Sequence, residues 1–105
     1  MNLADYPLVV TVWHQPGCGH CEEFLPRLEA FAEKYGTCVP TLAIDATQNE
    51  RIADALAIDA TPTVIVLRRG TTLRRFPRGL EDEELERLYE SVAGACQIVA
   101  SRGGD

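Results

Sequence analysis

Two cysteines, Cys18 and Cys21, are separated by only two residues, a spacing that lets their sulfur atoms form a disulfide or share a metal ion. They lie where an apolar run of strand length, residues 8–13, gives way to apolar residues at helical spacing, residues 22–35. Two thiols at the start of a helix that follows a buried strand most often form a redox dithiol. A metal-binding half-site and an inert pair are the alternatives.

The expected position of the two thiols gives them different chemistry. A thiol attacks a disulfide only as thiolate, and an ordinary cysteine, with a pKa of about 8.5, is only slightly ionised near neutral pH. Cys18 at a helix N-terminus faces unpaired N–H groups and the positive end of the dipole, which should lower its pKa, and a protonated His20 would add positive charge. Cys21, one turn further in, should be more buried and suited to attack a mixed disulfide formed at Cys18. Glu22 and Glu23 partly oppose this stabilisation.

The elements that must position the dithiol begin with a strand over residues 8–14, apolar on both faces as in a central strand. The following helix starts at Cys18, contains Pro26, which should kink it, and has Gly36 in place for its C-cap.

A second strand is predicted over about residues 39–45, and Pro40 near its start suits an edge strand. Residues 47–50, Thr-Gln-Asn-Glu, have the pattern of a capping box and should open a short helix. The expected buried side of this helix is Ile52, Ala55 and Leu56.

A third strand is predicted over residues 64–67, a hairpin turn at 69–71 and a fourth strand over 72–76. After Gly79 a last helix should start with the acidic run 81–84, which favours the positive helix end. Its inner face is predicted to be Leu85, Leu88, Tyr89, Val92 and Cys96.

The element order β-α-β-α-β-β-α predicts an α/β fold. Right-handed crossovers at each β-α-β step should bring the first three strands together with helices on both faces, and the hairpin then adds an antiparallel fourth strand. The expected order is 2-1-3-4 in a four-stranded mixed sheet. The length of 105 residues fits a single domain over residues 1–105, with a short N-terminal segment, 1–7, and a frayed tail, 99–105.

Composition narrows the function classes. Hydrophobic residues make up 46% and charged residues 25%, as in a globular protein rather than a disordered one. The net charge of -6 argues against general nucleic-acid binding, and no apolar stretch reaches the ~18 residues of a membrane span. Nucleic acid and membranes are therefore not expected partners. Half of the 10 basic residues are expected to protect an exposed edge strand rather than bind an acidic partner: Arg68, Arg69, Arg74, Arg75 and Arg78.

Residues 1–7 lack the basic and apolar regions of a secretory signal, so a cytoplasmic location is expected. Cys38 and Cys96 should lie at the end of the domain opposite the dithiol, as two buried free thiols rather than a structural disulfide. Since no second CxxC motif occurs, a four-cysteine zinc site is not expected, and His14 is interpreted as structural rather than as a ligand.

The run Cys18-Gly19-His20-Cys21 resembles the active site of the thioredoxin superfamily, with the Gly-His pair typical of protein disulfide isomerase domains. Pro16 matches a proline common before that motif, and Pro26 resembles the family's helix-kinking proline, five residues after the second cysteine. The resemblance covers residues 8 to about 96. It implies a minimal thioredoxin fold and thiolate tuning by Gly19 and His20.

The Thr61-Pro62 pair resembles the family's cis-proline loop, which lies against the dithiol and holds substrate backbone as an added strand. Pro62 follows Cys18 by 44 residues, the separation found in typical thioredoxins. Gly70 is similar to the family's hairpin glycine and Gly79 to the glycine that lines the substrate groove. Thr61, Pro62 and Gly79 are thus the expected substrate-binding residues.

Two residues depart from the family pattern. Val12 stands six residues before Cys18, where many relatives have a buried carboxylate that assists proton transfer to the second cysteine. Without a substitute, the mixed disulfide should be resolved more slowly. Gly17 replaces a tryptophan that forms part of the apolar platform around the dithiol. Only 17 residues precede Cys18, so the extra N-terminal strand and helix of full thioredoxins are expected to be absent.

The leading hypothesis is a monomeric thiol-disulfide oxidoreductase in which Cys18 attacks and Cys21 resolves, with their own disulfide as the only redox group and no metal or other cofactor. Its expected partners are disulfide-containing proteins or small thiols, and a reductase or thiol pool that recycles the dithiol. A redox-silent binding module and a metal carrier that pairs two CxxC motifs, with His20 as a further ligand, are the alternatives. The Gly-His pair favours an oxidant or isomerase, whereas a chain without a signal favours a reductase.

Overall fold

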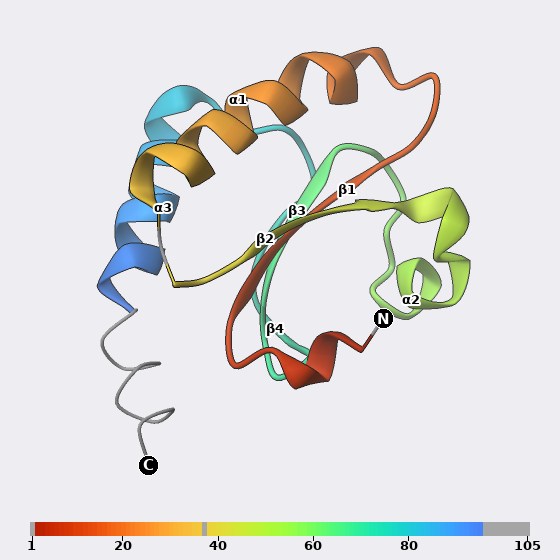
Figure 1. Cartoon of the computed structure of the whole chain (residues 1–105). Helices are drawn as coiled ribbons and strands as arrows, with labels where there is room; N and C mark the ends of the chain where they lie inside the picture. The colour runs from red at the N-terminus through yellow and green to blue at the C-terminus, as the bar shows by residue number, and fades with distance from the viewer. Residues whose placement is uncertain (1, 37, 96–105) are drawn as a thin grey trace.

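The computed structural model describes residues 2–36 and 38–95, which form a four-stranded sheet with helices on both faces (Figure 1). None of the helices in these two ranges combines the length and the apolar character needed to cross a membrane. In chain order the elements are η1 (Leu3–Asp5), β1 (Val9–His14), α1 (Gly19–Tyr35), β2 (Thr41–Asp45), η2 (Ala46–Gln48), α2 (Glu50–Ala55), β3 (Thr63–Arg68), β4 (Thr71–Phe76) and α3 (Asp82–Gly94).

The strand order β2-β1-β3-β4 confirms the prediction. The direction of β3 differs from the prediction. Strand β1 pairs parallel to β2 but antiparallel to β3, and β3 pairs antiparallel to β4. The expectation that a second crossover returns the third strand parallel to the first is therefore wrong. The six residues of α2 rise only about 9 Å, which is too short to carry the chain back along the sheet. Consequently β3 starts at the edge where β1 and β2 end, with Thr63 opposite Trp13.

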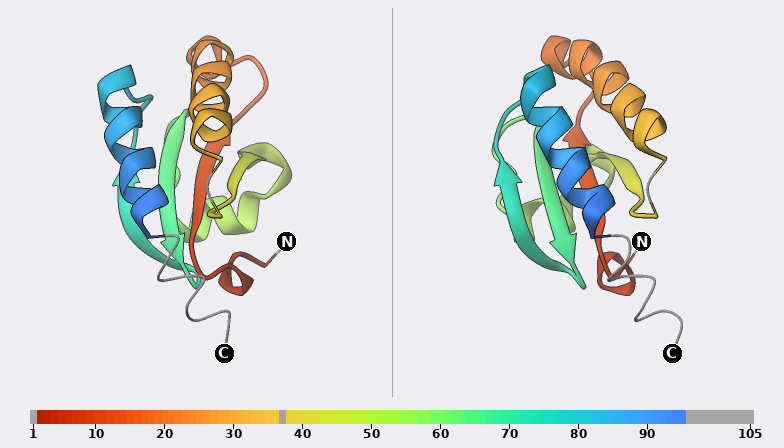
Figure 2. Two further views of the ribbon diagram at one scale, coloured as in Figure 1. Left: turned by 60° about the vertical axis from the view of Figure 1, so that its left-hand side comes forward. Right: turned by 90° about the vertical axis from the view of Figure 1, so that its left-hand side faces the viewer.

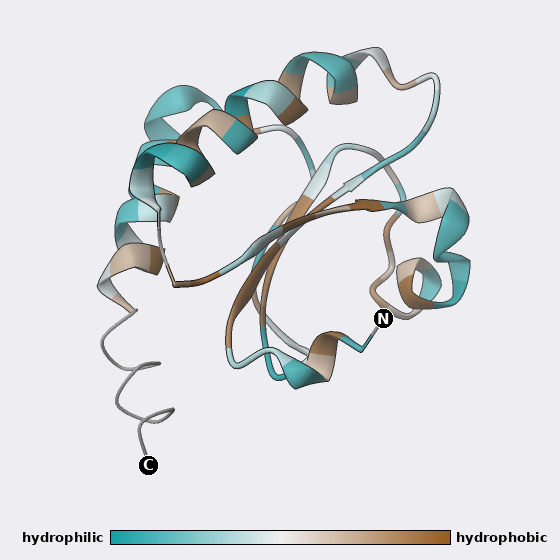
Figure 3. Cartoon of the chain, viewed as in Figure 1, coloured by the Kyte–Doolittle hydropathy of each residue, from teal (hydrophilic) through white to brown (hydrophobic). Residues whose placement is uncertain are grey.

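The two central strands, β1 and β3, are buried between two helical layers, whereas β4 is exposed. Helices α1 and α3 cover one face, and α2 and η1 cover the other (Figure 2). Alternate residues of β1 serve the two layers, because Val10 and Val12 pack with the α1 and α3 side chains while Val9 and Trp13 pack with those of η1 and α2. In Figure 3 apolar residues colour much of the central strands, and polar residues colour much of the helices. The predicted central position of β1 is confirmed, since it is buried on both faces.

The predicted ends of α1 and of the hairpin are confirmed. Cys18 is the N-cap of α1, and Gly36 is its C-cap with a left-handed φ of 48°. The hairpin between β3 and β4 turns through Arg69 and Gly70, whose φ values are 50° and 85°. Pro26 lies inside α1, as expected, and is exposed.

The start of α2 differs from the prediction. The side chain of Asp45 accepts the N–H of Thr47 at 2.8 Å, so this threonine belongs to η2 rather than to a capping box. Asn49 is the N-cap of α2 and makes no side-chain capping bond. The buried residue of α2 is Ala53, whereas Ala55 is exposed. An aspartate two residues before a backbone N–H forms a local turn that competes with helix capping.

A capping box does occur at α3, where the side chains and backbones of Glu81 and Glu84 pair reciprocally. The predicted inner face of α3 is confirmed for its described members, Leu85, Leu88, Tyr89 and Val92.

Two expectations concern residues at the limits of the description. Cys38 is exposed, and no cysteine within residues 2–36 and 38–95 is a free thiol, so a buried free thiol at Cys38 is wrong. Cys96 and the predicted frayed tail, residues 99–105, lie outside the described residues.

Candidate functional site

The dithiol follows β1 through a tight turn. The N–H of Cys18 donates to the carbonyl of Gln15 at 3.4 Å, with Pro16 and Gly17 between them. Gly17 has a φ of 79°, so the turn has the proline and the positive-φ glycine of a type II turn. A side chain at Gly17 would meet no atom within 4 Å but would strain the backbone. The turn reverses the chain so that α1 starts directly at Cys18.

Cys18 and Cys21 form a disulfide, with their Cα atoms 5.2 Å apart. The backbone N–H of Cys21 donates to Cys18 Sγ at 3.1 Å, so the first turn of α1 supplies a hydrogen bond that would also stabilise a thiolate there. Cys21 is only 2% exposed, whereas Cys18 is half-buried. The predicted difference in depth is confirmed, and a substrate can approach Cys18 but not Cys21.

The loop before β3 forms the wall beside Cys18. The Thr61-Pro62 peptide bond is cis, as the resemblance implied, and Pro62 is buried. The carbonyl oxygen of Thr61 lies 3.5 Å from Cys18 Sγ. This contact depends on the antiparallel direction of β3, because only that direction brings the start of β3 to the edge where β1 ends.

A groove of about 850 Å³ continues from this loop between α1 and α3. Gly79 lies on its wall at close range: an added Cβ would be 3.4 Å from Phe24 Cδ1 and 3.6 Å from Pro62 Cγ. His20 lies on its rim and is exposed, as is Gly19 beside it. The residues that the structure brings together are Cys18, Gly19, His20, Cys21, Thr61, Pro62 and Gly79. Pro26, which was assigned a structural role, is not among the residues that line the groove.

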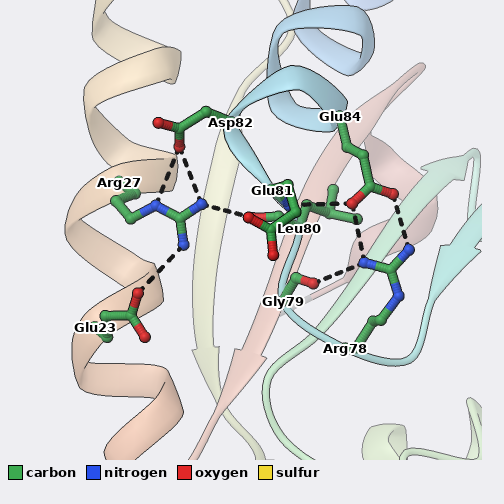
Figure 4. Close-up of polar contacts among 8 residues, drawn as sticks. All are labelled: Glu23, Arg27, Arg78, Gly79, Leu80, Glu81, Asp82 and Glu84. Atoms are coloured by element: carbon green, nitrogen blue, oxygen red, sulfur yellow. Dashed lines mark hydrogen bonds and ion pairs between the residues drawn. The ribbon is translucent and has the colours of Figure 1, made fainter.

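Two arginines line the same groove (Figure 4). Sequence reasoning missed Arg27, and its expectation that Arg78 protects an edge strand is wrong, because β4 ends at Phe76. Arg27 extends from α1 to the start of α3, where its Nε and Nη2 donate to Asp82 Oδ1 at 3.1 and 3.0 Å and its Nη2 also donates to the Leu80 carbonyl at 2.9 Å. Its Nη1 lies 3.6 Å from a carboxylate oxygen of Glu23, one turn earlier. The spacing of Glu23 and Arg27 on one helix could have indicated their ion pair. Nothing in the sequence indicated the contacts of Arg27 with residues more than 50 positions away.

Arg78 forms the second contact of this kind. Its two terminal nitrogens donate to the two carboxylate oxygens of Glu84 at 3.1 and 2.8 Å, and one also donates to the Gly79 carbonyl at 2.9 Å. The hydrogen bonds from Arg78 and from the Glu81 N–H lower the pKa of Glu84 to about 2, and the carboxylate in turn raises the pKa of Arg78. The loop that joins β4 to α3 is therefore fixed by charge-assisted bonds.

No carboxylate is buried within the described part of the chain, where the only buried polar residues are Thr11 and Thr63. Val12 is fully buried and packs in the apolar core with Phe24 and Leu28. Residues 2–36 and 38–95 thus provide no buried acid beneath Cys21. The same residues contain no group of three or more metal-ligating side chains.

Comparison with known proteins places this geometry in context. A family model described as Thioredoxin matches residues 2–91. Thioredoxin-T of Drosophila melanogaster is 30% identical over 92 residues, which cover 88% of this chain and 58% of that protein. Protein disulfide-isomerase A3 of Gallus gallus is 33% identical over 105 residues, covering 99% of this chain and 21% of that protein. The chain therefore spans less than two thirds of either relative.

Among solved structures, a thioredoxin from Nicotiana alata superposes with a TM-score of 0.72 at 26% identity, and the match covers 84% of this chain and 75% of that one.

Proposed function

This chain belongs to the thioredoxin family, and from that premise we propose that it acts as a thiol-disulfide oxidoreductase on protein or small-molecule disulfides. The observation that carries the proposal is the Cys18–Cys21 disulfide at the N-terminus of α1, with the half-buried Cys18 beside the carbonyl of Thr61, a residue that lines the neighbouring groove. The helix N-terminus favours a thiolate at the sulfur that a substrate can reach.

In the reducing direction, the Cys18 thiolate attacks one sulfur of the substrate disulfide. A mixed disulfide forms, and the other substrate sulfur leaves as a thiolate. Cys21 then loses its proton and attacks Cys18 Sγ, which releases the second substrate thiolate and forms the Cys18–Cys21 disulfide. Two electrons pass to the substrate, whose two thiolates take up two protons. A reductase or a pool of small thiols returns two electrons to the protein, and the reverse sequence forms disulfides.

The remaining residues serve this reaction by position. Thr61 and Pro62 provide the wall against which an extended substrate segment lies next to Cys18, and Gly79 keeps the part of the groove beside Pro62 free of a side chain. His20, on the exposed rim, supplies positive charge near the thiolate when it is protonated. Since no buried carboxylate lies within the described residues, Cys21 must lose its proton to solvent or to the departing thiolate.

An insulin-reduction assay with dithiothreitol tests the proposal. Cys18→Ser should abolish turnover, because the serine hydroxyl cannot act as the attacking group. Cys21→Ser should instead accumulate mixed disulfides at Cys18, since the resolving thiol is missing. Cys38→Ser, which changes a cysteine before β2, is the matched control and should retain turnover. Turnover by Cys18→Ser at the wild-type rate would refute the proposed role.

The direction of electron flow follows from the reduction potential of the dithiol against glutathione. A potential of about -270 mV would indicate a reductase, and a potential of about -180 mV would indicate an oxidant or isomerase. The expected cytoplasmic location and monomeric state stay predictions. Cell fractionation and sedimentation of the purified chain would check them.

A further inference from the structure

The loop that joins β4 to α3, residues 77–81, lines the groove next to Pro62. Its inner side is in close contact with its surroundings. Gly79 approaches both Phe24 and Pro62, and Leu80 is 1% exposed within the core shared by α1 and α3. A small displacement of this loop would therefore change the width of the groove beside the dithiol.

Arg27 holds this loop from outside. It donates through Nη2 to the Leu80 carbonyl, one residue from Gly79, and through Nε and Nη2 to Asp82, the first residue of α3. Figure 4 shows the guanidinium between α1 and the loop, with these bonds on one side and Glu23 on the other. Arg27 also lies over the ring of Phe24, at 5.7 Å from the ring centre, so the same side chain contacts both the loop and the residue beneath Gly79.

This set of contacts differs from an ordinary surface ion pair. Arg27 bonds the Asp82 carboxylate through two nitrogens and the Leu80 carbonyl through one of them, and its planar guanidinium fixes the directions of these donors, which the flexible ammonium of a lysine does not. The other ion pair between α1 and α3 is a single contact of 3.4 Å between Lys34 and Glu86, further along both helices. The two pairs join the same two helices, but only Arg27 contacts the groove loop.

We propose that Arg27 is a positioning residue for substrate binding, which fixes the loop 77–81 against α1 and thereby holds the groove open to an extended protein segment beside Cys18. The proposal rests on the function proposed above. Because Arg27 does not contact the sulfur atoms, its role concerns the binding of a protein disulfide and not the reactivity of Cys18. A small disulfide, which does not need the groove, should be reduced without its help.

The test compares kcat and KM for insulin with the rate of reaction of a small aromatic disulfide. Arg27→Ala should raise the KM for insulin about fivefold with kcat nearly unchanged, since an exposed charged contact contributes an effect of this size. The rate with the small disulfide should stay within about twofold of wild type. Arg27→Lys should give a KM between those of wild type and Arg27→Ala, because lysine keeps the positive charge but lacks the planar pair of donor nitrogens.

Lys34→Ala is the matched control, since it breaks an ion pair between the same helices away from the groove. It should leave unchanged the KM and kcat for insulin and the rate with the small disulfide. Thermal unfolding of each variant shows that the compared proteins are folded. Asp82→Asn supplies a second variant, which should raise the KM for insulin in the same direction.

Equal KM values for Arg27→Ala and Lys34→Ala would overturn the inference, as would an equal loss of rate with insulin and with the small disulfide. A wild-type protein that reduces neither substrate would instead refute the proposed function itself.

Discussion

Cys18 and Cys21 are the same chemical group in two different environments. Cys18 caps α1, accepts the Cys21 N–H and is half-buried, while Cys21 is 2% exposed. Their different roles follow from burial, because a substrate sulfur can reach only Cys18. Val12 completes this environment: it is an apolar residue in the core, so proton removal from Cys21 depends on groups outside the core.

Thr11 is a buried polar residue whose contribution to stability can be measured. Its hydroxyl donates to the Ile65 carbonyl at 2.8 Å and accepts from Trp13 Nε1 at 2.9 Å. Thr11→Val keeps the shape but leaves the indole N–H without its acceptor, so unfolding in urea should show a loss of about 1–3 kcal/mol.

Thr72→Val, on the exposed strand β4, is the control and should change stability by less than about 0.5 kcal/mol. Similar values for the two variants would show that the buried hydrogen bonds contribute nothing beyond side-chain shape.

The start of α3 connects a helix cap to the groove. Glu84 accepts the Glu81 N–H at 3.1 Å and both terminal nitrogens of Arg78, so one carboxylate fixes the helix end and the loop before it. Arg27 fixes the same loop to α1 through Leu80 and Asp82. The groove wall is thus held by two arginines, and each bonds a carboxylate together with a backbone carbonyl.

The lowered pKa of Glu84 predicts a pH dependence of stability. Its pKa is about 2 in the folded protein against an ordinary value of 4.5. The charged form is favoured by folding, so this contribution is fully present above pH 4.5 and is lost as the pH falls toward 2. The free energies of unfolding of wild type and Glu84→Gln should therefore converge across that window.

A constant difference between wild type and Glu84→Gln from pH 6 to about pH 2 would contradict the assignment.

The site as a whole is assembled from segments far apart in the sequence. The dithiol follows β1, the Thr61-Pro62 loop precedes β3, and Gly79 lies between β4 and α3. They meet because β3 runs antiparallel to β1, so that one strand ends where the other begins. The opposite direction would have placed Pro62 at the far edge of the sheet. The reactive environment of Cys18 therefore belongs to the folded chain.

Unfolding should remove this environment. In the reduced protein, alkylation of Cys18 by iodoacetamide at pH 7, followed by peptide mapping, should slow on passing through the urea unfolding transition. In the unfolded chain the sulfur loses the Cys21 N–H and the helix N-terminus and becomes an ordinary thiol with a pKa of about 8.5. A rate that does not fall on unfolding would show that the fold does not activate Cys18.

Features that depend on near neighbours were predictable from the sequence. The apolar run of β1, the helix after Cys18 and the Gly36 cap are determined by residues within a turn or two, and the structure has each of them. The different burial of Cys18 and Cys21 follows from their offset of one helical turn. The prediction of a capping box at residues 47–50 was wrong, because the side chain of Asp45 accepts the N–H of Thr47 and places this threonine in η2.

By itself, then, the sequence determined the dithiol, the elements around it and their order in the sheet. Only the tertiary structure decided the direction of β3, which depends on how far the short α2 can carry the chain. It also decided the contact between Arg27 and the loop before α3, because nothing near Arg27 in the sequence shows that Leu80 and Asp82 pack beside it. Local periodicity is a property of neighbouring residues, whereas strand direction and long-range ion pairs arise from the packing of whole elements.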